Sequence, residues 1–324
     1  MREILISQKI EHNKEYHALC PNCSSGSVSI LLETSDFKFS EEKFAISKCS
    51  NCQLIFTQNP PLPSEAGYYY KSKNYISHSD SKVGFVNKLY HLVRSIMLNR
   101  KRKILEKLTN SRKILDIGSG TGYFLNELKQ HQWNVTGVEI SEEARIYCFS
   151  KFNIQTHDPS YLTSLKVDEK FDIITLWHVF EHIYDFKGLL ENIFTLLKDD
   201  GKLIVAVPNS ESYDANYYKE VWAGYDVPRH LWHFSISSLS QILSSKGFNI
   251  DQIKRMPFDG YYVSLLSEAN LKNRFGFING FKVGFISHIL SLFKKSKGSS
   301  LIYIISKTKN HVGNSRKSIW PKFN

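Results

Sequence analysis

The stretch LWHVFEH, at residues 176–182, holds two imidazoles and a carboxylate close together as His178, Glu181 and His182. His-x-x-Glu-His is the arrangement of an inverted zinc-protease motif. Such a site keeps both histidines in the middle of one helix, whereas His178 directly follows the apolar run FDIITL, which is typical of a buried strand. The sequence suggests no distant third ligand. We therefore interpret the three side chains as the wall of a ligand pocket rather than a peptidase site.

A second polar cluster lies in WAGYDVPRHLWHFS, which begins at Trp222. A long loop rich in Trp, Tyr, His and Arg suits a lid over an acceptor. Arg229 could bind a phosphate or a carboxylate through two parallel hydrogen bonds. An aromatic cluster upstream contains Tyr75 and suits either a pocket wall or packing between modules. The candidate acceptor-binding residues are Tyr75, Trp222, Arg229 and His233.

Four of the five cysteines form two Cys-x-x-Cys pairs, Cys20 with Cys23 and Cys49 with Cys52, separated by 25 residues. Two such pairs supply four thiolates to one tetrahedral zinc ion. The alternating segments VSILLE and KFAIS between the pairs suit a small hairpin. Since no fifth ligand is near, we expect a structural zinc site that folds the module. Cys148, on a predicted helix, is expected to be a core residue.

The elements that must position these side chains alternate between strand and helix. ILDI, at residues 114–117, indicates a buried strand, and Gly118-Ser-Gly120-Thr-Gly122 and an amphipathic helix follow it. Glycines let the backbone approach a ligand, and the helix start offers free N–H groups. Tyr123 stands where a dinucleotide-binding loop needs glycine. The loop therefore suits a nucleoside with a charged amino-acid tail better than a pyrophosphate.

A second strand, NVTGVEIS, ends at Glu139, whose carboxylate can accept hydrogen bonds from both hydroxyls of a ribose at the carboxyl edge of the sheet. Asp158 lies in a later loop, where an adenine amino group could be bound. Further strands are expected near Ile154 and over FDIITL, KLIVAVPN, NIDQIKRM and SSLIYIISKT, with Ser141 and Ser237 as helix caps. This alternation predicts a mostly parallel α/β sheet.

At this point the sequence resembles the class I S-adenosylmethionine-dependent methyltransferases. The matching pieces are ILDIGSGTGYF, VTGVEIS, FDIITLWHVFEHI and LLKDDGKLIVAVPN, in the family's order and spacing, and they cover about residues 100–256. The run that begins CSNCQLIFTQNPP resembles a subgroup with a zinc-binding module ahead of this fold. The resemblance implies a Rossmann-like seven-stranded sheet with helices on both faces, preceded by a small zinc-ribbon-like module.

The resemblance also implies a cofactor site. The glycine loop would surround the methionine part of S-adenosylmethionine, Glu139 would bind the ribose and Ile140 would flank the adenine. In this family the position of Glu181 and His182 lines the pocket for cofactor and acceptor, and some relatives place a divalent cation there, which stays an open alternative. The cofactor-binding candidates are Asp116, Gly118, Ser119, Gly120, Gly122, Glu139, Ile140, Asp158 and His178.

The implied chemistry is an in-line displacement, in which an acceptor oxygen, nitrogen or carbon attacks the sulfonium methyl group. A base that removes the acceptor's proton works best with a pKa near neutrality. We rank His230 first and His178 second, with His182 and Glu181 as further catalytic candidates. Deoxysugar C-methyltransferases carry a Glu-His pair where this chain has Arg229 and His230, so the class of accepting atom stays open.

The 324 residues carry a formal net charge of +11, which is unevenly placed. Residues 82–113 hold ten Lys/Arg and one acid, and residues 294–324 hold eight Lys/Arg and no acid. Such clusters suit RNA or anionic lipid, although solvated basic helices are commoner. We expect methyl transfer to a small molecule such as a sugar, a glycan or another cell-envelope or secondary-metabolite precursor. RNA methylation is the alternative, and a non-catalytic zinc-dependent binding protein is a remote one.

We expect three parts: a zinc-binding module over 1–60, a linker with an amphipathic helix over 61–110, and a catalytic domain over 111–324. An insertion at 257–300 holds an apolar segment, for which we favour a buried helix or dimer contact over membrane contact through 275–295. The first residues lack the apolar centre of a signal peptide, and no run reaches the ~18 apolar residues of a membrane span. A cytoplasmic location is expected, peripheral to the membrane's inner face in the membrane alternative.

Overall fold

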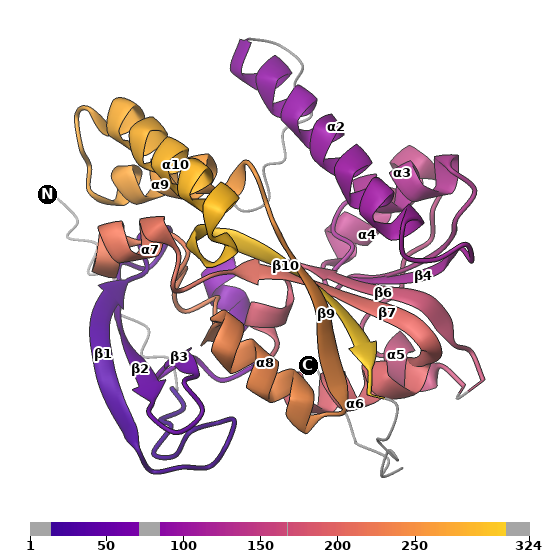
Figure 1. Ribbon diagram of the computed structural model, residues 1–324, viewed down its shortest axis with the longest axis horizontal. Helices are drawn as coiled ribbons and strands as arrows, with labels where there is room; N and C mark the ends of the chain where they lie inside the picture. Colours follow the sequence, from indigo (N-terminus) through magenta and orange to yellow (C-terminus); the bar gives the residue numbers. More distant parts are fainter. Residues whose placement is uncertain (1–13, 71–84, 167, 309–324) are drawn as a thin grey trace, which may run out of the picture.

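The strands form two sheets in the computed structural model, which describes residues 14–70, 85–166 and 168–308. The larger sheet has the strand order β5-β4-β6-β7-β10-β9, and the smaller has the order β1-β2-β3-β8. Figure 1 shows β1, β2 and β3 of the smaller sheet, in indigo, beside the larger sheet.

The six-stranded sheet confirms the predicted fold class. Its strands β5, β4, β6 and β7 are parallel. At one edge β10 pairs antiparallel with β7, and β9 pairs antiparallel with β10, so β10 alone runs against the other five strands. Every residue of β6 is buried, as expected for a parallel strand covered on both faces. The strands are β4 (Lys113–Ile117), β5 (Asn134–Val138), β6 (Phe171–Trp177), β7 (Leu197–Pro208), β9 (Phe248–Arg255) and β10 (Ser300–Lys307).

The third strand of the expected seven is reduced to one bridge between Val138 and His157. Asn153 has a left-handed backbone at the end of the preceding helix, and Pro159 cannot donate to a ladder. Between these two residues, only His157 pairs with the sheet, through its single bridge to Val138.

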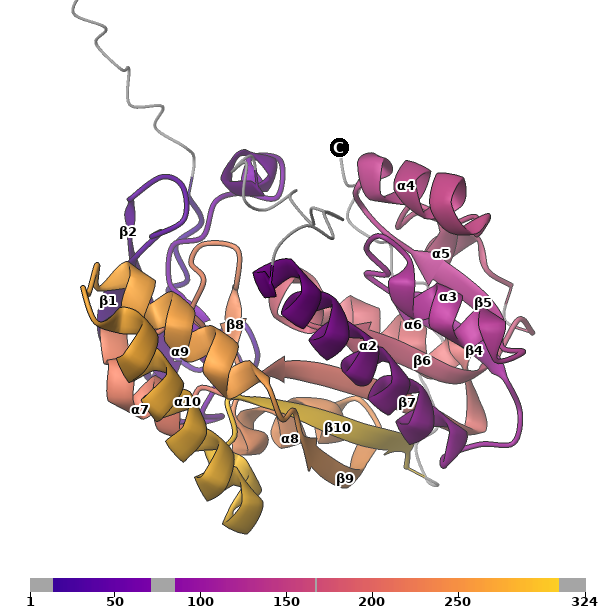
Figure 2. The same cartoon turned by 90° about the horizontal axis from the view of Figure 1, so that it is seen from above.

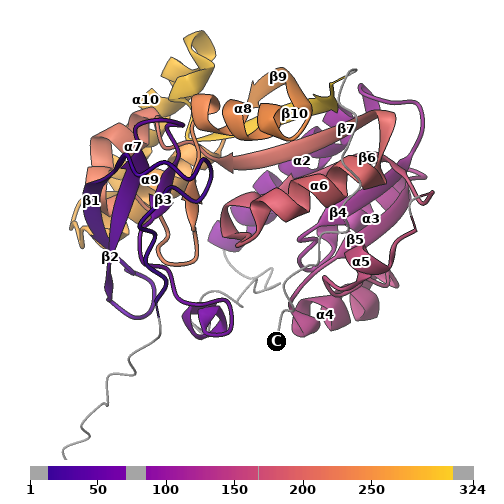
Figure 3. The same cartoon turned by 90° about the horizontal axis from the view of Figure 1, so that it is seen from below.

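Helices cover both faces of this sheet. Helices α2 and α3 pack on one face, in view in Figure 2, and α6 and α8 on the other, where Figure 3 shows α6 lying across the strands. Ser141 caps α4 as predicted, but Ser235 rather than Ser237 caps α8, in a capping box with Ser238. The helices are α2 (Phe85–Glu106), α3 (Tyr123–Gln130), α4 (Glu142–Phe152), α5 (Tyr161–Ser164), α6 (Phe186–Leu196) and α8 (Ile236–Ser245).

The smaller sheet is built mainly by the cysteine-rich segment. The predicted hairpin is β1 (Val28–Ser35) with β2 (Lys43–Cys49), followed by β3 (Ile55–Thr57). The fourth strand, β8 (Trp232–His233), comes from the loop after β7 and pairs with β3. The cysteine-rich segment therefore shares a sheet with the loop after β7 and does not form a separate module.

The insertion after β9 is a helical hairpin of α9 (Asp259–Asn270) and α10 (Gly276–Phe293). By length and composition alone, helix α10 is long and apolar enough to cross a membrane. Only 33% of it is buried inside the protein. Helix α10 is not buried within the chain, because most of its large apolar side chains are exposed; the dimer contact stays a prediction. Short helices complete the fold: η1 (Ala66–Tyr70), η2 (Phe180–His182), α7 (Tyr213–Tyr218), η3 (Lys219–Val221) and η4 (Lys295–Lys297).

Candidate active site

The glycine loop follows β4 at the carboxyl edge of the sheet. Gly118, Gly120 and Gly122 all have left-handed backbones, with φ of 74°, 54° and 80°. A Cβ atom on Gly118 would lie 2.2 Å from Val179 Cγ2, and one on Gly122 would lie 2.1 Å from Cys148 Sγ. At Gly120 a Cβ atom would meet nothing within 4 Å. The loop therefore packs closely against neighbouring side chains at both ends, at Gly118 and Gly122. In its middle, the backbone at Gly120 is open to a ligand.

Glu139, after the neighbouring strand β5, reaches over this loop. Its Oε2 accepts a hydrogen bond from Gly120 N–H at 2.8 Å, and its Oε1 accepts one from Ser141 N–H at 2.9 Å. Each carboxylate oxygen can accept more than one hydrogen bond, so both keep capacity for ligand hydroxyls. Ile140, 65% exposed, lies beside it. Asp158 is also exposed and accepts a hydrogen bond from Ser160 N–H.

Asp116, near the end of β4, is buried, and so is Ser119. The Oδ1 atom of Asp116 accepts a hydrogen bond from Thr175 Oγ1 at 2.5 Å, and burial raises the pKa of the Asp116 carboxyl to about 7. Lys101, from α2, lies over the Trp177 ring at 4.3 Å. Burial lowers the pKa of Lys101 to about 8, against the opposing effect of Asp116. Lys101 and Thr175 were missed because a lysine on a basic helix and a threonine in a strand carry no local signal.

His178 directly follows β6 and has a left-handed backbone, with φ of 57°. Its Nδ1 lies 3.5 Å from Glu181 Oε1, and its Nε2 lies 3.4 Å from Asp259 Oδ2 and 3.4 Å from Met256 Sδ. Burial alone would lower the pKa of His178, but the facing carboxylates of Asp259 and Glu181 raise it to about 10. The imidazole is therefore charged at neutral pH. Sequence reasoning missed Asp259 because only the fold brings α9 to this strand end.

Glu181 and two histidines form a compact group beneath His178. Glu181 is fully buried, and neither carboxylate oxygen has a hydrogen-bond partner within the described residues. His182 Nδ1 faces Arg229 O at 2.9 Å, and His230 Nδ1 faces Gly224 O at 2.9 Å. If each Nδ1–H donates to its carbonyl, each Nε2 keeps a lone pair. Donor atoms of Glu181, His182 and His230 lie within 4.8 Å of one another, so this group could hold a metal ion.

His230 is the candidate base with the clearest geometry. Its Nε2 lies 4.0 Å from Glu181 Oε1. Burial and the neighbouring His182 lower the pKa of His230 to about 4, so the ring is neutral at physiological pH. Burial would raise the pKa of Glu181, but His178 and then the other two histidines lower it, and it stays a carboxylate.

Three of the candidate acceptor residues lie in the interior instead. Arg229 is buried and donates to Asp36 Oδ1 at 2.6 Å and Asp226 Oδ1 at 2.8 Å. This ion pair ties the smaller sheet to the loop after β7, so its donors are used within the protein. Trp222 is buried and donates from Nε1 to an Asp214 carboxylate oxygen at 2.8 Å.

His233 is buried in β8, where its Nε2 lies 3.2 Å from Thr57 Oγ1. Burial holds the pKa of His233 well below its usual value. We correct the acceptor-binding interpretation of Trp222, Arg229 and His233 on these contacts, since a loop rich in such residues can equally seal two modules together. The fourth candidate, Tyr75, lies outside the described residues.

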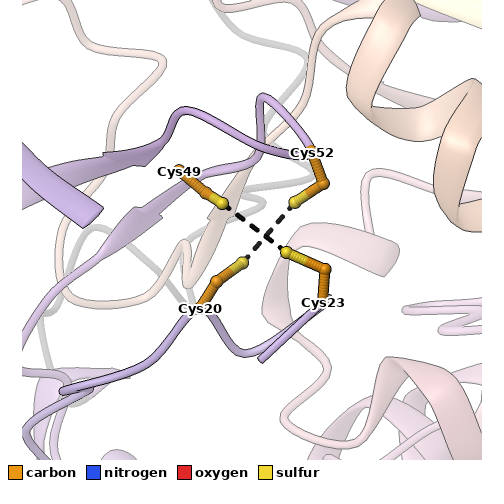
Figure 4. A group of neighbouring side chains, drawn as sticks. All are labelled: Cys20, Cys23, Cys49 and Cys52. Atoms are coloured by element: carbon orange, nitrogen blue, oxygen red, sulfur yellow. Dashed lines mark hydrogen bonds between the residues drawn. The ribbon is translucent and has the colours of Figure 1, made fainter. Parts of the chain in front are cut away.

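The four cysteines converge on one point (Figure 4). Cys20 Sγ lies 3.5 Å from Cys52 Sγ, and Cys23 Sγ lies 3.6 Å from Cys49 Sγ. A tetrahedral ion with bonds of about 2.3 Å to sulfur needs sulfurs about 3.8 Å apart. The donor set and its spacing fit such an ion. Asn51 Nδ2 adds a hydrogen bond to Cys23 Sγ at 3.4 Å.

Residues 90–253 match a family model described as "Methyltransferase domain". The chain is 32% identical over 143 residues to the ubiquinone biosynthesis O-methyltransferase of Coxiella burnetii, across 42% of this chain and 58% of that protein. It is 28% identical over 214 residues to the mitochondrial ubiquinone biosynthesis O-methyltransferase of Bos taurus, across 57% of this chain and 54% of that one. The chain thus spans a little over half the length of these relatives.

Among solved structures, a SAM-dependent methyltransferase from Archaeoglobus fulgidus is 26% identical to the chain, with a TM-score of 0.46. That similarity covers 66% of this chain and 94% of the other.

Proposed function

Since the chain belongs to the methyltransferase-domain family, we propose that it transfers a methyl group from S-adenosylmethionine to a small-molecule acceptor. One observation carries the proposal. The glycine loop and Glu139 end two adjacent parallel strands, and His178 with Glu181 follows the next strand of the same edge. Ligands of open α/β sheets bind at this carboxyl edge.

The residues on the glycine-loop side fit the cofactor. Gly120 offers open backbone, and both oxygens of Glu139 can accept further hydrogen bonds from ribose hydroxyls. Asp116 lies buried beneath the loop, and Ile140 offers an apolar flank for the adenine. When bound, S-adenosylmethionine supplies an electrophilic methyl group on a positively charged sulfur.

His178 and His230 have different roles in the proposed reaction. His178 is already protonated between Glu181 and Asp259, so it donates hydrogen bonds and does not accept a proton at neutral pH. His230 is neutral and has an unprotonated Nε2 that can take the acceptor's proton, although its pKa of about 4 makes it a weaker base than an ordinary imidazole. The Glu181 carboxylate, 4.0 Å away, stabilises the imidazolium that forms.

An oxygen of a small molecule is the acceptor that we propose. The relatives' names include O-methyltransferase. Among small molecules, quinone precursors, sugars, glycans and other cell-envelope or secondary-metabolite precursors are the classes to test. RNA is less favoured because part of the basic helix α2 is used internally: Arg102 pairs with Glu106 and Glu127, and Lys101 lies over Trp177.

The cysteine cluster is proposed to hold a structural zinc ion. Metal analysis should find zinc stoichiometric with the chain, and Cys49→Ser should lose it. Cys148→Ser is the matched control, since Cys148 is also buried but packs with Leu125 and Ile154. Equal zinc in both variants would contradict the assignment.

Calorimetry with S-adenosylmethionine tests the cofactor site. Glu139→Ala should weaken binding by about tenfold to a hundredfold, because hydrogen bonds from the ribose to a charged group are lost. Glu143→Ala is the control, an exposed glutamate on the first turn of α4. Unchanged affinity in Glu139→Ala would overturn the site.

The acceptor is sought by incubating fractionated cell extract with methyl-labelled S-adenosylmethionine. Label should enter a low-molecular-mass fraction, and label that enters RNA would refute the small-molecule assignment. With the labelled fraction as substrate, His230→Asn should lower the rate by about 10²–10⁴-fold. Its S-adenosylmethionine affinity should stay unchanged. A rate equal to that of the unmodified enzyme would exclude His230 as the base.

A further inference from the structure

Helix α10 turns its large apolar side chains outward. The side chains it buries are almost all small: Gly276, Gly280, Val283, Gly284, Ser287 and Ser291. Its exposed face is large and apolar: Phe277, Ile278, Phe281, Phe285, Leu292 and Phe293. A surface helix of a water-soluble domain normally buries its large apolar residues and exposes polar ones.

The small residues bring α10 into backbone contact with α9. A Cβ atom on Gly284 would lie 2.6 Å from Tyr261 Cα, and one on Gly280 would lie 3.0 Å from Leu265 Cα. The side of α9 that it faces buries the small residues Gly260, Ser264 and Ser267, and also Glu268, which accepts a hydrogen bond from Asn279 of α10. Helices pack through small residues in this way where the surrounding medium is lipid and large side chains gain nothing by turning inward.

The exposed residues of α10 form a continuous stripe. At about 100° per residue, five of them fall within an arc of about 100° beside the arc of the small residues: Phe277, Ile278, Phe281, Phe285 and Leu292. Phe277 is 74% exposed, and Phe293, at the end of the helix, is 86% exposed. Phe275, before the helix, and Tyr262, on α9, add to the same hairpin's exposed apolar surface. An apolar stripe of this kind marks a docking surface.

Basic residues surround the stripe. Residues 271–298 contain six Lys/Arg and no acid: Lys272, Arg274, Lys282, Lys294, Lys295 and Lys297. All but the partly exposed Lys297 are exposed. A second copy of this face would bring like charges together, whereas anionic lipid headgroups complement them.

We propose that the α9–α10 hairpin is a docking surface for an anionic lipid bilayer. Helix α10 lies along the bilayer surface, because Lys282 interrupts its middle and its small-residue face stays against α9. Helix α2 lies on the same upper side of the molecule, as Figures 1 and 2 show, and exposes Leu92 and Ile96.

Docking here would also place the candidate pocket beside the membrane. Asp259, the first residue of α9, lies 3.4 Å from His178 Nε2, and His288 of α10 faces Pro257 O at 3.1 Å. On the basis of the proposed function, the acceptor would then be an amphipathic molecule drawn from the bilayer. The docking itself does not depend on methyl transfer.

Sedimentation with vesicles tests the docking. The full chain should bind vesicles of phosphatidylcholine with about a third phosphatidylglycerol, more tightly than phosphatidylcholine alone and more weakly as salt rises. The triple variant Phe277→Ser, Phe281→Ser, Phe285→Ser should lower the partition coefficient about tenfold or more. The matched control is Ile146→Ser with Phe149→Ser, two exposed apolar residues of α4. This control should bind like the unmodified chain.

Three results would overturn the proposal: no sedimentation at low salt, an unaffected triple variant, or a control that loses as much binding. If the unmodified chain forms a dimer and does not bind vesicles, and the triple variant is a monomer, the face would instead be assigned to contact with a second copy. Calorimetry with S-adenosylmethionine on the same samples checks folding of the triple variant. It also separates the two proposals, because vesicle binding without cofactor binding would refute only the proposed function.

Discussion

Helices α6 and α10 are both apolar, but they turn opposite kinds of side chain toward the protein. Helix α6 buries its large residues, including Leu189, Leu190 and Ile193, against the sheet. Helix α10 buries glycine and serine and exposes phenylalanine. The first arrangement gains hydrophobic free energy from removing area from water, whereas the second gains close backbone packing and leaves its area for another medium. Apolar content alone does not say which side of a helix the protein uses.

The largest expected effect is on α6. Leu190→Ala should lower the free energy of unfolding by about 2–5 kcal/mol, because Leu190 is fully buried and its removal leaves a cavity. Chemical denaturation measures the change. A loss below about 1 kcal/mol would mean that α6 is not held by its large residues as described.

The next effect concerns the small face of α10. Gly284→Ala should cost about 1–3 kcal/mol although alanine favours helix, because the new Cβ would meet the backbone of Tyr261. Gly67→Ala is the comparison, since a Cβ there meets nothing within 4 Å. Equal stabilities of both variants would show that the helices of the hairpin do not need this close approach.

A smaller effect comes from the charged contact that holds the start of the hairpin to the sheet. His178 faces Asp259, and its pKa in the folded protein is raised to about 10. A raised histidine pKa contributes stability that is fully present below the unfolded value near 6.5 and is lost as the pH rises through about 10. Since His178 is partly exposed, we expect only about 1 kcal/mol after solvent screening.

The measurement for this contact is the free energy of unfolding between neutral pH and pH 10, compared between the unmodified chain and Asp259→Asn. The difference between the two should shrink as the pH rises. A difference that grows with pH would have the opposite sign to a stabilising His178–Asp259 pair.

The smallest effect is on the outer face of α10. Phe285→Ala should change the free energy of unfolding in vesicle-free buffer by no more than about 0.5 kcal/mol, because Phe285 is half exposed. Thermal or chemical unfolding tests this beside Leu190→Ala. A loss as large as that of Leu190→Ala would place Phe285 in the core and remove the contrast between the two helices.

Local patterns in the sequence determined much of the larger sheet and the positions of the four cysteines. The run ILDI, the glycines after it and Ser141 each depend on neighbours in the chain, through buried strand character, positive φ and helix capping. Cys-x-x-Cys pairs bring two sulfurs together within a single turn, so their convergence follows from spacing. The expected strand near Ile154 is reduced to the single bridge between Val138 and His157, in a segment bounded by the left-handed Asn153 and by Pro159.

Only the tertiary structure decided which polar residues meet. Arg229 had the chemistry to bind an acceptor, but Asp36, nearly two hundred residues away in the chain, takes its guanidinium. Asp259 had no motif, yet the fold places it against His178 and sets that ring's charge. The direction in which α10 faces was decided in the same way, because the backbone of α9 can come this close only where α10 presents glycine. Pairing across such distances depends on packed geometry, which no local spacing encodes.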